Sequence, residues 1–108
     1  MTDNQLLHLA AKAAGHPSCV WRGTTIVLAD AGERLWNPLT DDGDALRLAV
    51  DLGLRIYPHA STASGYICSA VAGGDNTRLG EAIGTGDVRA DTRRAIVRAA
   101  AAIGEAMP

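Results

Sequence analysis

Between Trp36 and Gly53 an extended segment gives way to a helix, and this stretch, WNPLTDDGDALRLAVDLG, constrains the fold more than any other. Pro38 favours extended geometry at the residue before it and cannot donate a hydrogen bond to a sheet, so the chain must turn here. Either Thr40 or Asp41 can then accept hydrogen bonds from the first free N–H groups of a helix. Glycine commonly follows a helix end in a left-handed conformation, so Gly53 predicts where this helix stops.

The helix predicted from about residue 40 to residue 52 is apolar around most of its circumference. After its first residues only Asp44, Arg47 and Asp51 are polar, and their spacing places them on one narrow solvent-facing stripe with two helical ion pairs. We therefore expect the rest of its surface, including Leu46, to pack in the core. The acids of the first turn lie where the helix dipole stabilises carboxylates. They lack the spacing of a calcium-binding loop, so we assign them to helix capping.

Two more helices and two hairpins are expected elsewhere in the chain. Thr2 and Gln5 have the capping-box spacing that predicts a helix over residues 3–14. Either Asp91 or the nearby Asp87 is expected to open a last apolar helix, from Thr92 to about Ile103, with Ile96 in the core. Strand-like runs at 24–28 and 33–36 predict one hairpin, runs at 54–59 and 66–71 predict another, and residues 19–21 fit either a short strand or an irregular crossing.

The segment from Gly73 to Asp87 contains five glycines, which predict a mobile loop. Leu79 and Ile83 could support a short helical turn within it. The elements then follow the order α-β-β-α-β-β-α, which predicts an α+β fold formed by one domain over residues 1–108. In this prediction both hairpins join one antiparallel sheet of about four strands, with two apolar helices packed on one face.

Composition excludes several classes of function. The chain has 108 residues and a formal net charge of −2, so it creates no positive field for non-specific nucleic acid binding. It has no apolar run of about 18 residues that could span a membrane, and its start lacks the basic-then-apolar order of a secretory signal. We therefore expect a cytoplasmic protein. In a reducing compartment Cys19 and Cys68 are expected to be buried small hydrophobic residues and not a disulfide.

Neither a metal site nor a catalytic site can be assembled from the sequence. His16, Cys19, His59 and Cys68 are zinc-ligand types, but only the first two have a short ligand spacing. The hydroxyl residues that follow His59 match no nucleophile motif and have no orienting acid nearby. We assign no catalytic residue, no metal ligand and no cofactor, and we do not expect an enzyme.

A glycine-rich segment flanked by arginines is the remaining candidate site. Backbone N–H groups and guanidinium groups can together hold a phosphate. The segment has neither the lysine of a Walker motif nor the third glycine of a dinucleotide fingerprint. The alternative is that the arginines are solvated or paired with Asp87, Asp91 and the acids of the helix over residues 40–52, which is ordinary on protein surfaces. The candidate binding residues are Arg78, Arg89, Arg93, Arg94, Arg98, Gly84 and Gly86.

Two stretches together carry a resemblance to known proteins. One contains WNPLTDDGDALRLAV and the other is ADTRRAIVRAAAAIG, and the resemblance covers residues 36–53 and 90–104, about a third of the chain. They resemble a group of small phage and prophage proteins and, more distantly, the NinX-like phage family. The resemblance implies an accessory protein of an infected or lysogenic bacterial cell, and it implies no catalytic residue.

These observations favour stoichiometric binding to a host or phage macromolecule, most simply a protein, which would thereby be inhibited or modulated without catalysis. We expect the contact surface to include the loop between Gly73 and Asp87, with Arg78 and Arg89 at its ends. The alternative is that the glycine-rich loop and the arginines sequester a small phosphorylated ligand such as a nucleotide signal.

Overall fold

The computed structural model describes residues 2–16, 19–22, 25–28, 34–62, 65–72 and 78–107, with the backbone alone at 19–22, 25, 28, 34, 59–62, 78, 79 and 83. Its helices and strands confirm an α+β fold. In chain order they are α1 (Asp3–Ala13), β1 (Cys19–Arg22), β2 (Thr25–Leu28), β3 (Arg34–Trp36), α2 (Asp42–Leu52), β4 (Arg55–Thr62), β5 (Gly65–Val71), β6 (Arg78–Ile83) and α3 (Val88–Ala106).

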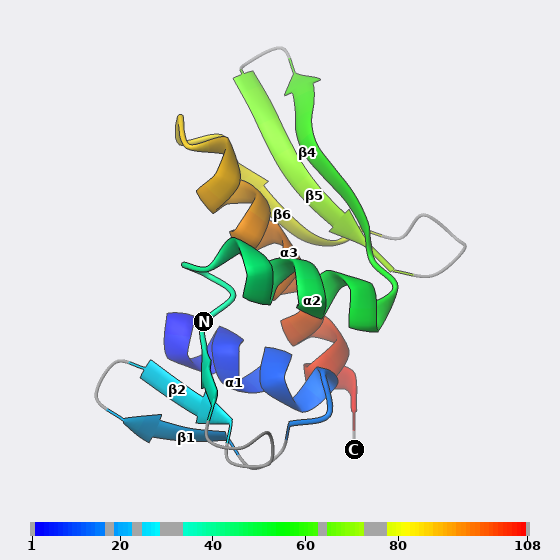
Figure 1. Ribbon diagram of the computed structural model, residues 1–108. Coiled ribbons are helices and arrows are strands. Elements are labelled where there is room, and N and C mark those ends of the chain that lie inside the picture. Colours follow the sequence, from blue (N-terminus) through cyan, green and yellow to red (C-terminus); the bar gives the residue numbers. More distant parts are fainter. Residues whose placement is uncertain are drawn as a thin grey trace.

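The strands form two antiparallel sheets toward opposite ends of the molecule (Figure 1). One has the order β1-β2-β3 and the other has the order β4-β5-β6. Both predicted hairpins are confirmed, because Ile26 pairs with Trp36 and Ile56 pairs with Ala70. The expectation that the hairpins join in one sheet is wrong. The 11 residues of α2 carry the chain from one sheet to the other, and each hairpin gains its third strand from an adjacent segment, β1 or β6.

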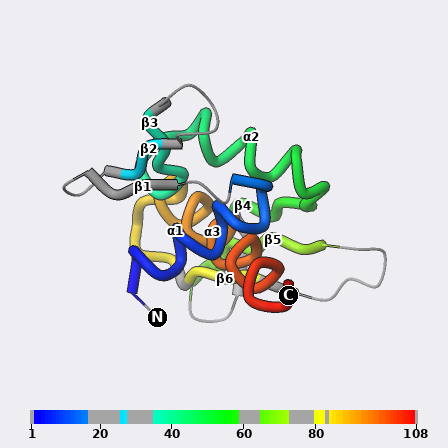
Figure 2. The backbone as a smooth tube through the Cα atoms, turned by 90° about the horizontal axis from the view of Figure 1, so that it is seen from below, coloured from blue at the N-terminus to red at the C-terminus, as the bar shows by residue number. Residues whose placement is uncertain are grey.

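α3 is the element around which the others are packed. It covers one face of the β4-β5-β6 sheet, which we call the inner face, and it also packs against α1 and α2 (Figure 2). It begins at Val88 and not at Thr92, because Asp87 caps it by accepting a hydrogen bond from the Ala90 N–H at 3.0 Å. Ile96 is buried on α3, as predicted.

Residues 78–83 form a strand, which corrects two predictions for the glycine-rich segment. β6 pairs with β5, so this part of the segment is neither a mobile loop nor a short helical turn around Leu79 and Ile83. Gly80 is buried against α3, where a Cβ atom would collide with the backbone of Ala95 and Ala99. Glycine is therefore needed here for a close approach of backbones and not for mobility. Residues 73–77 lie outside the described part of the chain.

The central stretch begins and ends its helix as predicted. Asp41 is the capping residue, and its carboxylate accepts a hydrogen bond from the Asp44 N–H at 2.8 Å. Gly53 follows the helix with a φ of 65°, in the left-handed region that favours glycine. The predicted capping box of Thr2 and Gln5 at the start of α1 is also present.

One face of α2 departs from the prediction, because it is apolar and exposed. Leu46 is 58% exposed and Val50 is 69% exposed, so neither belongs to the core. The buried apolar residues of the helix are Ala45, Leu48 and Ala49, which form a neighbouring face. α2 packs on α3 from one side only, and its other apolar residues therefore remain in contact with solvent.

Asp44 is a second correction, because it is buried and not on a solvent-facing stripe. Its carboxylate accepts hydrogen bonds from the Asn37 N–H at 2.9 Å and from the Arg47 guanidinium at 2.8 Å. A buried carboxylate requires such partners to offset the loss of its hydration. Asp44 thus joins α2 to the turn that precedes it, and the predicted ion pair between Asp44 and Arg47 is confirmed. The predicted ion pair between Arg47 and Asp51 is wrong, because Asp51 pairs with none of the residues that the structure describes.

Candidate functional site

Arg93 connects α3 to the start of α2. Its Nε donates a hydrogen bond to the carbonyl oxygen of Leu39 at 2.8 Å. Its Nη1 lies 2.5 Å from a carboxylate oxygen of Asp42 and forms an ion pair with it. These contacts agree with the alternative in which the arginines pair with acids of the central helix.

Arg94 and Arg98 also have acceptors within the protein. Arg94 forms an ion pair with Asp3 of α1 at 2.9 Å, and this hydrogen-bonded pair lowers the pKa of Asp3 and raises the pKa of Arg94. Arg98 donates a hydrogen bond to the carbonyl oxygen of Glu81 in β6 at 2.6 Å. The two arginines therefore join α3 to α1 and to the sheet edge.

Arg89 differs from these three arginines. Its side chain is exposed, and it forms no hydrogen bond or ion pair with another residue that the structure describes. It is the second residue of α3, beside the positive end of the helix dipole. For Arg78 only the backbone, at the start of β6, is described.

The two candidate glycines make internal hydrogen bonds. Gly84 donates its N–H to the carbonyl oxygen of Tyr66 at 3.0 Å. Gly86 donates its N–H to the hydroxyl oxygen of the same tyrosine, also at 3.0 Å. The N–H groups that were expected to hold a phosphate therefore have protein acceptors.

Asp91 fastens the segment between β6 and α3. Its buried carboxylate accepts hydrogen bonds from the Tyr66 hydroxyl at 2.7 Å and from the Thr85 N–H and hydroxyl, both at 2.9 Å. Burial opposes the ionisation of Asp91, but these hydrogen bonds outweigh it and lower its pKa. Donation to Asp91 in turn raises the pKa of Tyr66. This network has a structural role, because it holds the turn in place.

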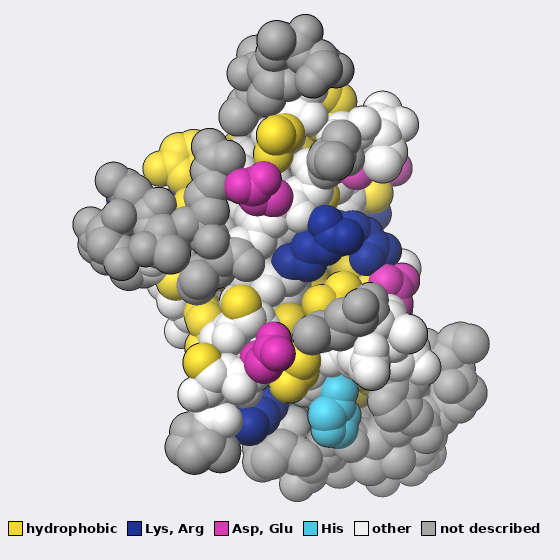
Figure 3. Space-filling model, turned by 180° about the vertical axis from the view of Figure 1, so that it is seen from behind, with side chains coloured by type: hydrophobic (Ala, Val, Ile, Leu, Met, Phe, Trp, Pro, Cys, Tyr) yellow, Lys and Arg dark blue, Asp and Glu magenta, His cyan; other side chains and the backbone are white. Residues whose placement is uncertain are grey.

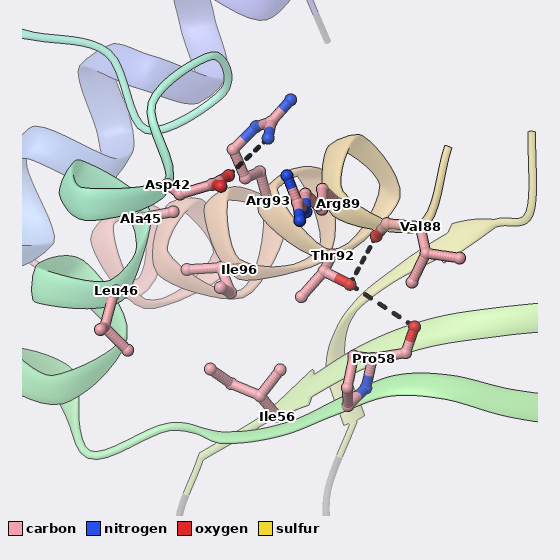
Figure 4. Close-up of a pocket in the computed structure, with 10 residues that line it drawn as sticks. All are labelled: Asp42, Ala45, Leu46, Ile56, Pro58, Val88, Arg89, Thr92, Arg93 and Ile96. Carbon is pink, nitrogen blue, oxygen red and sulfur yellow. Dashed lines mark hydrogen bonds and ion pairs between the residues drawn. The ribbon is translucent and has the colours of Figure 1, made fainter. Parts of the chain in front are cut away.

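An open groove lies between α2, β4 and the first turns of α3 (Figure 4), with a volume of about 270 Å³. Its apolar lining comes from Ala45, Leu46, Ile56, Pro58, Val88 and Ile96, and its polar lining comes from Asp42, Arg89, Thr92 and Arg93. In Figure 4 the two arginines and Asp42 gather at one end of the groove. We call this site the α2–α3 groove.

Most polar groups of the α2–α3 groove already have partners. Asp42 and Arg93 form an ion pair, and the Thr92 hydroxyl donates to the carbonyl oxygen of Val88 at 2.7 Å. Arg89 is the charged residue of the groove that has no partner among the described residues. The site therefore combines an apolar floor with one available guanidinium group.

The α2–α3 groove was not predicted from the sequence. The pattern that indicates it is the surplus of apolar residues on α2, since Leu46 and Val50 lie outside the face that Ala45, Leu48 and Ala49 form. The periodicity of apolar residues in a helix cannot show whether a second apolar face is buried or exposed.

Of the four residues considered for a metal site, only His16 and Cys68 have side chains that the structure describes. Cys68 is free and buried, as predicted, and its Sγ donates to the carbonyl oxygen of Pro58 at 2.7 Å. The side chains of Cys19 and His59 lie outside the described residues. Among the residues described, no three His, Cys, Asp or Glu side chains form a group that could hold a metal ion.

On the back of the molecule, basic side chains near the middle of the face have acidic side chains around them (Figure 3). The charges on this face are thus mixed.

None of the described helices is long and apolar enough to cross a bilayer. Comparison with protein-family models, curated proteins and solved structures finds no match to the chain.

Proposed function

We propose that this protein is a phage or prophage accessory protein that binds a host or phage macromolecule stoichiometrically and modulates it without catalysing a reaction. The observation that carries the proposal is the α2–α3 groove, an exposed apolar concavity with Arg89 at its end, and Arg89 has no partner among the residues that the structure describes. Exposed apolar patches with polar rims are typical of interaction sites. The resemblance of the stretches that begin at Trp36 and Ala90 supports the phage context.

The state of the polar groups supports binding without turnover. A general acid or base must be able to exchange a proton with a substrate. Asp42 instead forms an ion pair with Arg93, and the carboxylate of Asp91 accepts three hydrogen bonds. These carboxylates stabilise the fold through their ion pair and hydrogen bonds, and a carboxylate held in this way is less available to exchange a proton with a substrate.

The proposed surface differs from the one expected around the glycine-rich segment. Residues 78–83 belong to a sheet, and Asp91 ties down the turn after them, which leaves this segment little freedom to close on a partner. Arg89 is common to both surfaces. Sequestration of a phosphorylated ligand would need several arginines, and Arg93, Arg94 and Arg98 have internal acceptors.

The test is affinity capture from host lysate followed by reconstitution from purified components, with native mass spectrometry of the captured sample. We expect a protein partner that binds saturably in a fixed molar ratio. A phosphorylated small molecule bound in place of a protein partner would favour sequestration. Multiple turnover of any substrate would contradict a mechanism of binding alone.

A further inference from the structure

We infer that the α2–α3 groove binds a segment of a protein partner that places apolar side chains on the groove floor and an acidic side chain beside Arg89. This inference rests on the proposed binding function. It adds to that function the location of the site and the chemistry of the segment that the site recognises.

The floor of the groove is a part of the apolar interior that the protein leaves uncovered. On the inner face of β5, Cys68 and Ala70 are fully buried beneath α3. On β4, in contrast, Ile56 is half-buried and Pro58 is exposed, although both line the groove. Leu46 projects from α2 into the same space (Figure 4). An apolar segment in the groove would remove these side chains from water, which is the main driving force for association.

The position of Arg89 contradicts what helix stability alone would favour. A cation in the first turn of a helix opposes the helix dipole, which favours carboxylates there. Arg89 gains no compensating ion pair within the described part of the chain, whereas Arg93, four residues later on the same helix, pairs with Asp42. A residue that breaks a local rule without an internal compensation is typical of a functional site. Its guanidinium is available for a carboxylate of a partner.

A protein segment fits the groove better than a small molecule or a second copy of this chain does. The floor includes the exposed Leu46 and Pro58, so a small molecule would stay largely in contact with solvent, whereas ligand pockets usually enclose their ligands. A second copy would bring the same surface to a two-fold contact. It would thus present another Arg89 and another Asp42 that is already paired with Arg93, and the groove itself would supply no free carboxylate.

The probes for the test are short peptides selected for binding to the full chain from a random display library. The selected peptides are synthesised in two forms, one with the native acidic residues and one with lysine in their place. Calorimetric titration measures their Kd values, and amide chemical shifts locate the bound peptide. We expect the selected sequences to combine apolar residues with Asp or Glu, and we expect the shifts to map to α2, β4 and the start of α3.

Two matched variants of α2 test the apolar floor. Leu46→Gln and Val50→Gln each remove an exposed apolar side chain from the same helix, and glutamine is a good helix former. Leu46 lines the groove and Val50 does not. We expect Leu46→Gln to weaken peptide binding about tenfold or more, as loss of an anchor residue does, and Val50→Gln to leave the Kd unchanged.

A charge exchange tests the role of Arg89. Arg89→Glu should weaken binding of the acidic peptide and strengthen binding of its lysine counterpart, each about tenfold. A glutamate in the first turn agrees with the helix dipole, so this variant should fold. Equal affinity of wild type and variant for both peptides would overturn the role of Arg89.

Other outcomes would overturn the inference as a whole. These are a selection without enriched peptides, shifts that map away from the groove, or a dimer in sedimentation that Leu46→Gln dissociates. A captured partner that binds Leu46→Gln and Arg89→Glu as well as it binds wild type would show that the groove is not the binding site. The proposed binding function would then remain in place. Turnover of a substrate would contradict the proposed function instead.

Discussion

Arg89 and Arg93 lie one helical turn apart on α3, but the structure uses them differently. Arg93 is largely buried and joins the carbonyl oxygen of Leu39 and the carboxylate of Asp42. Arg89 is exposed, with no described partner, and lies near the positive end of the helix dipole. The two residues therefore provide a comparison between a structural arginine and a candidate recognition arginine.

We expect Arg93→Gln to lower the free energy of unfolding by about 1–2 kcal/mol, because it removes a charge-assisted hydrogen bond to a partly buried carbonyl. Arg89→Glu should instead leave it unchanged or raise it by up to about 1 kcal/mol through the helix dipole. Urea denaturation followed by circular dichroism measures both values. A loss of stability in Arg89→Glu equal to that in Arg93→Gln would show that Arg89 has a structural role.

At the scale of elements, α2 shows that apolar composition does not by itself bury a helix. Ala45, Leu48 and Ala49 pack in the core, while Leu46 and Val50 of the same helix contact solvent. α3, in contrast, is covered by α1, by α2 and by the sheet, so its apolar residues are buried on several sides. The number of elements that pack against each helix therefore decides how much of its apolar surface is buried.

Truncation of the two helices should therefore have unequal effects. Ile96→Ala should lower the free energy of unfolding by about 2–5 kcal/mol, because it removes methyl groups from a site that is 3% exposed. Leu46→Ala removes an exposed side chain and should change it by less than about 0.5 kcal/mol. Thermal melting of the two variants measures the difference. Equal losses would mean that Leu46 is buried in solution.

Gly80→Ala should destabilise the packing of β6 on α3. The added methyl group would meet the backbone of Ala95 and Ala99, which cannot move independently of the helix. We expect a loss of about 3 kcal/mol or more, at the upper end for overpacking. Gly43→Ala is the control, because the atoms nearest to its methyl group are the ends of the Asp41 and Arg47 side chains and not backbone atoms. A stable Gly80→Ala variant would contradict the close approach of strand and helix.

At the scale of the whole molecule, α3 links parts that are distant in sequence. Arg94 joins it to Asp3 of α1, and Asp91 joins it to Thr85 and to Tyr66 of β5. Both carboxylates have pKa values lowered below the ordinary value of 3.8, because their ionised forms accept these hydrogen bonds. Protonation of Asp3 and Asp91 should therefore weaken contacts at two sides of α3.

The sign of the pH dependence follows from these lowered pKa values. A carboxylate with a lowered pKa in the folded state contributes stability above its unfolded pKa and loses it as the pH falls through the folded pKa. We expect the free energy of unfolding of wild type to fall below about pH 4 and that of Asp91→Asn to fall less. Asp91→Asn should already be less stable near pH 7, by about 1–3 kcal/mol.

Asp51→Asn is the matched control for this measurement. Asp51→Asn changes the formal charge by the same amount as Asp91→Asn. Asp51 is exposed on α2, however, and it has no hydrogen bond or ion pair with the other residues described. Its profile of stability against pH should follow that of wild type. A profile for Asp91→Asn that also follows wild type would contradict a stabilising role for the ionised Asp91.

Local chemistry in the sequence was sufficient to predict the class of the fold and the limits of several elements. The capping box at Thr2, the glycine after α2 and the two hairpins depend on residues close together in the chain, and the structure confirms them. The site was less predictable. Arg89 was predicted as a binding residue, whereas Leu46 was predicted to lie in the core, and neither Ile56 nor Pro58 was predicted to line a groove beside Arg89.

The amino-acid sequence by itself determined where helices start and stop, because caps, turns and short-range pairing act over a few residues. Only the tertiary structure decided which surfaces these elements bury. Gly80 became a packing position because α3 crosses β6, and Leu46 became exposed because α3 covers just one side of α2. Burial depends on contacts between residues far apart in the chain, and such contacts leave no periodicity in the sequence that distinguishes a covered apolar face from an uncovered one.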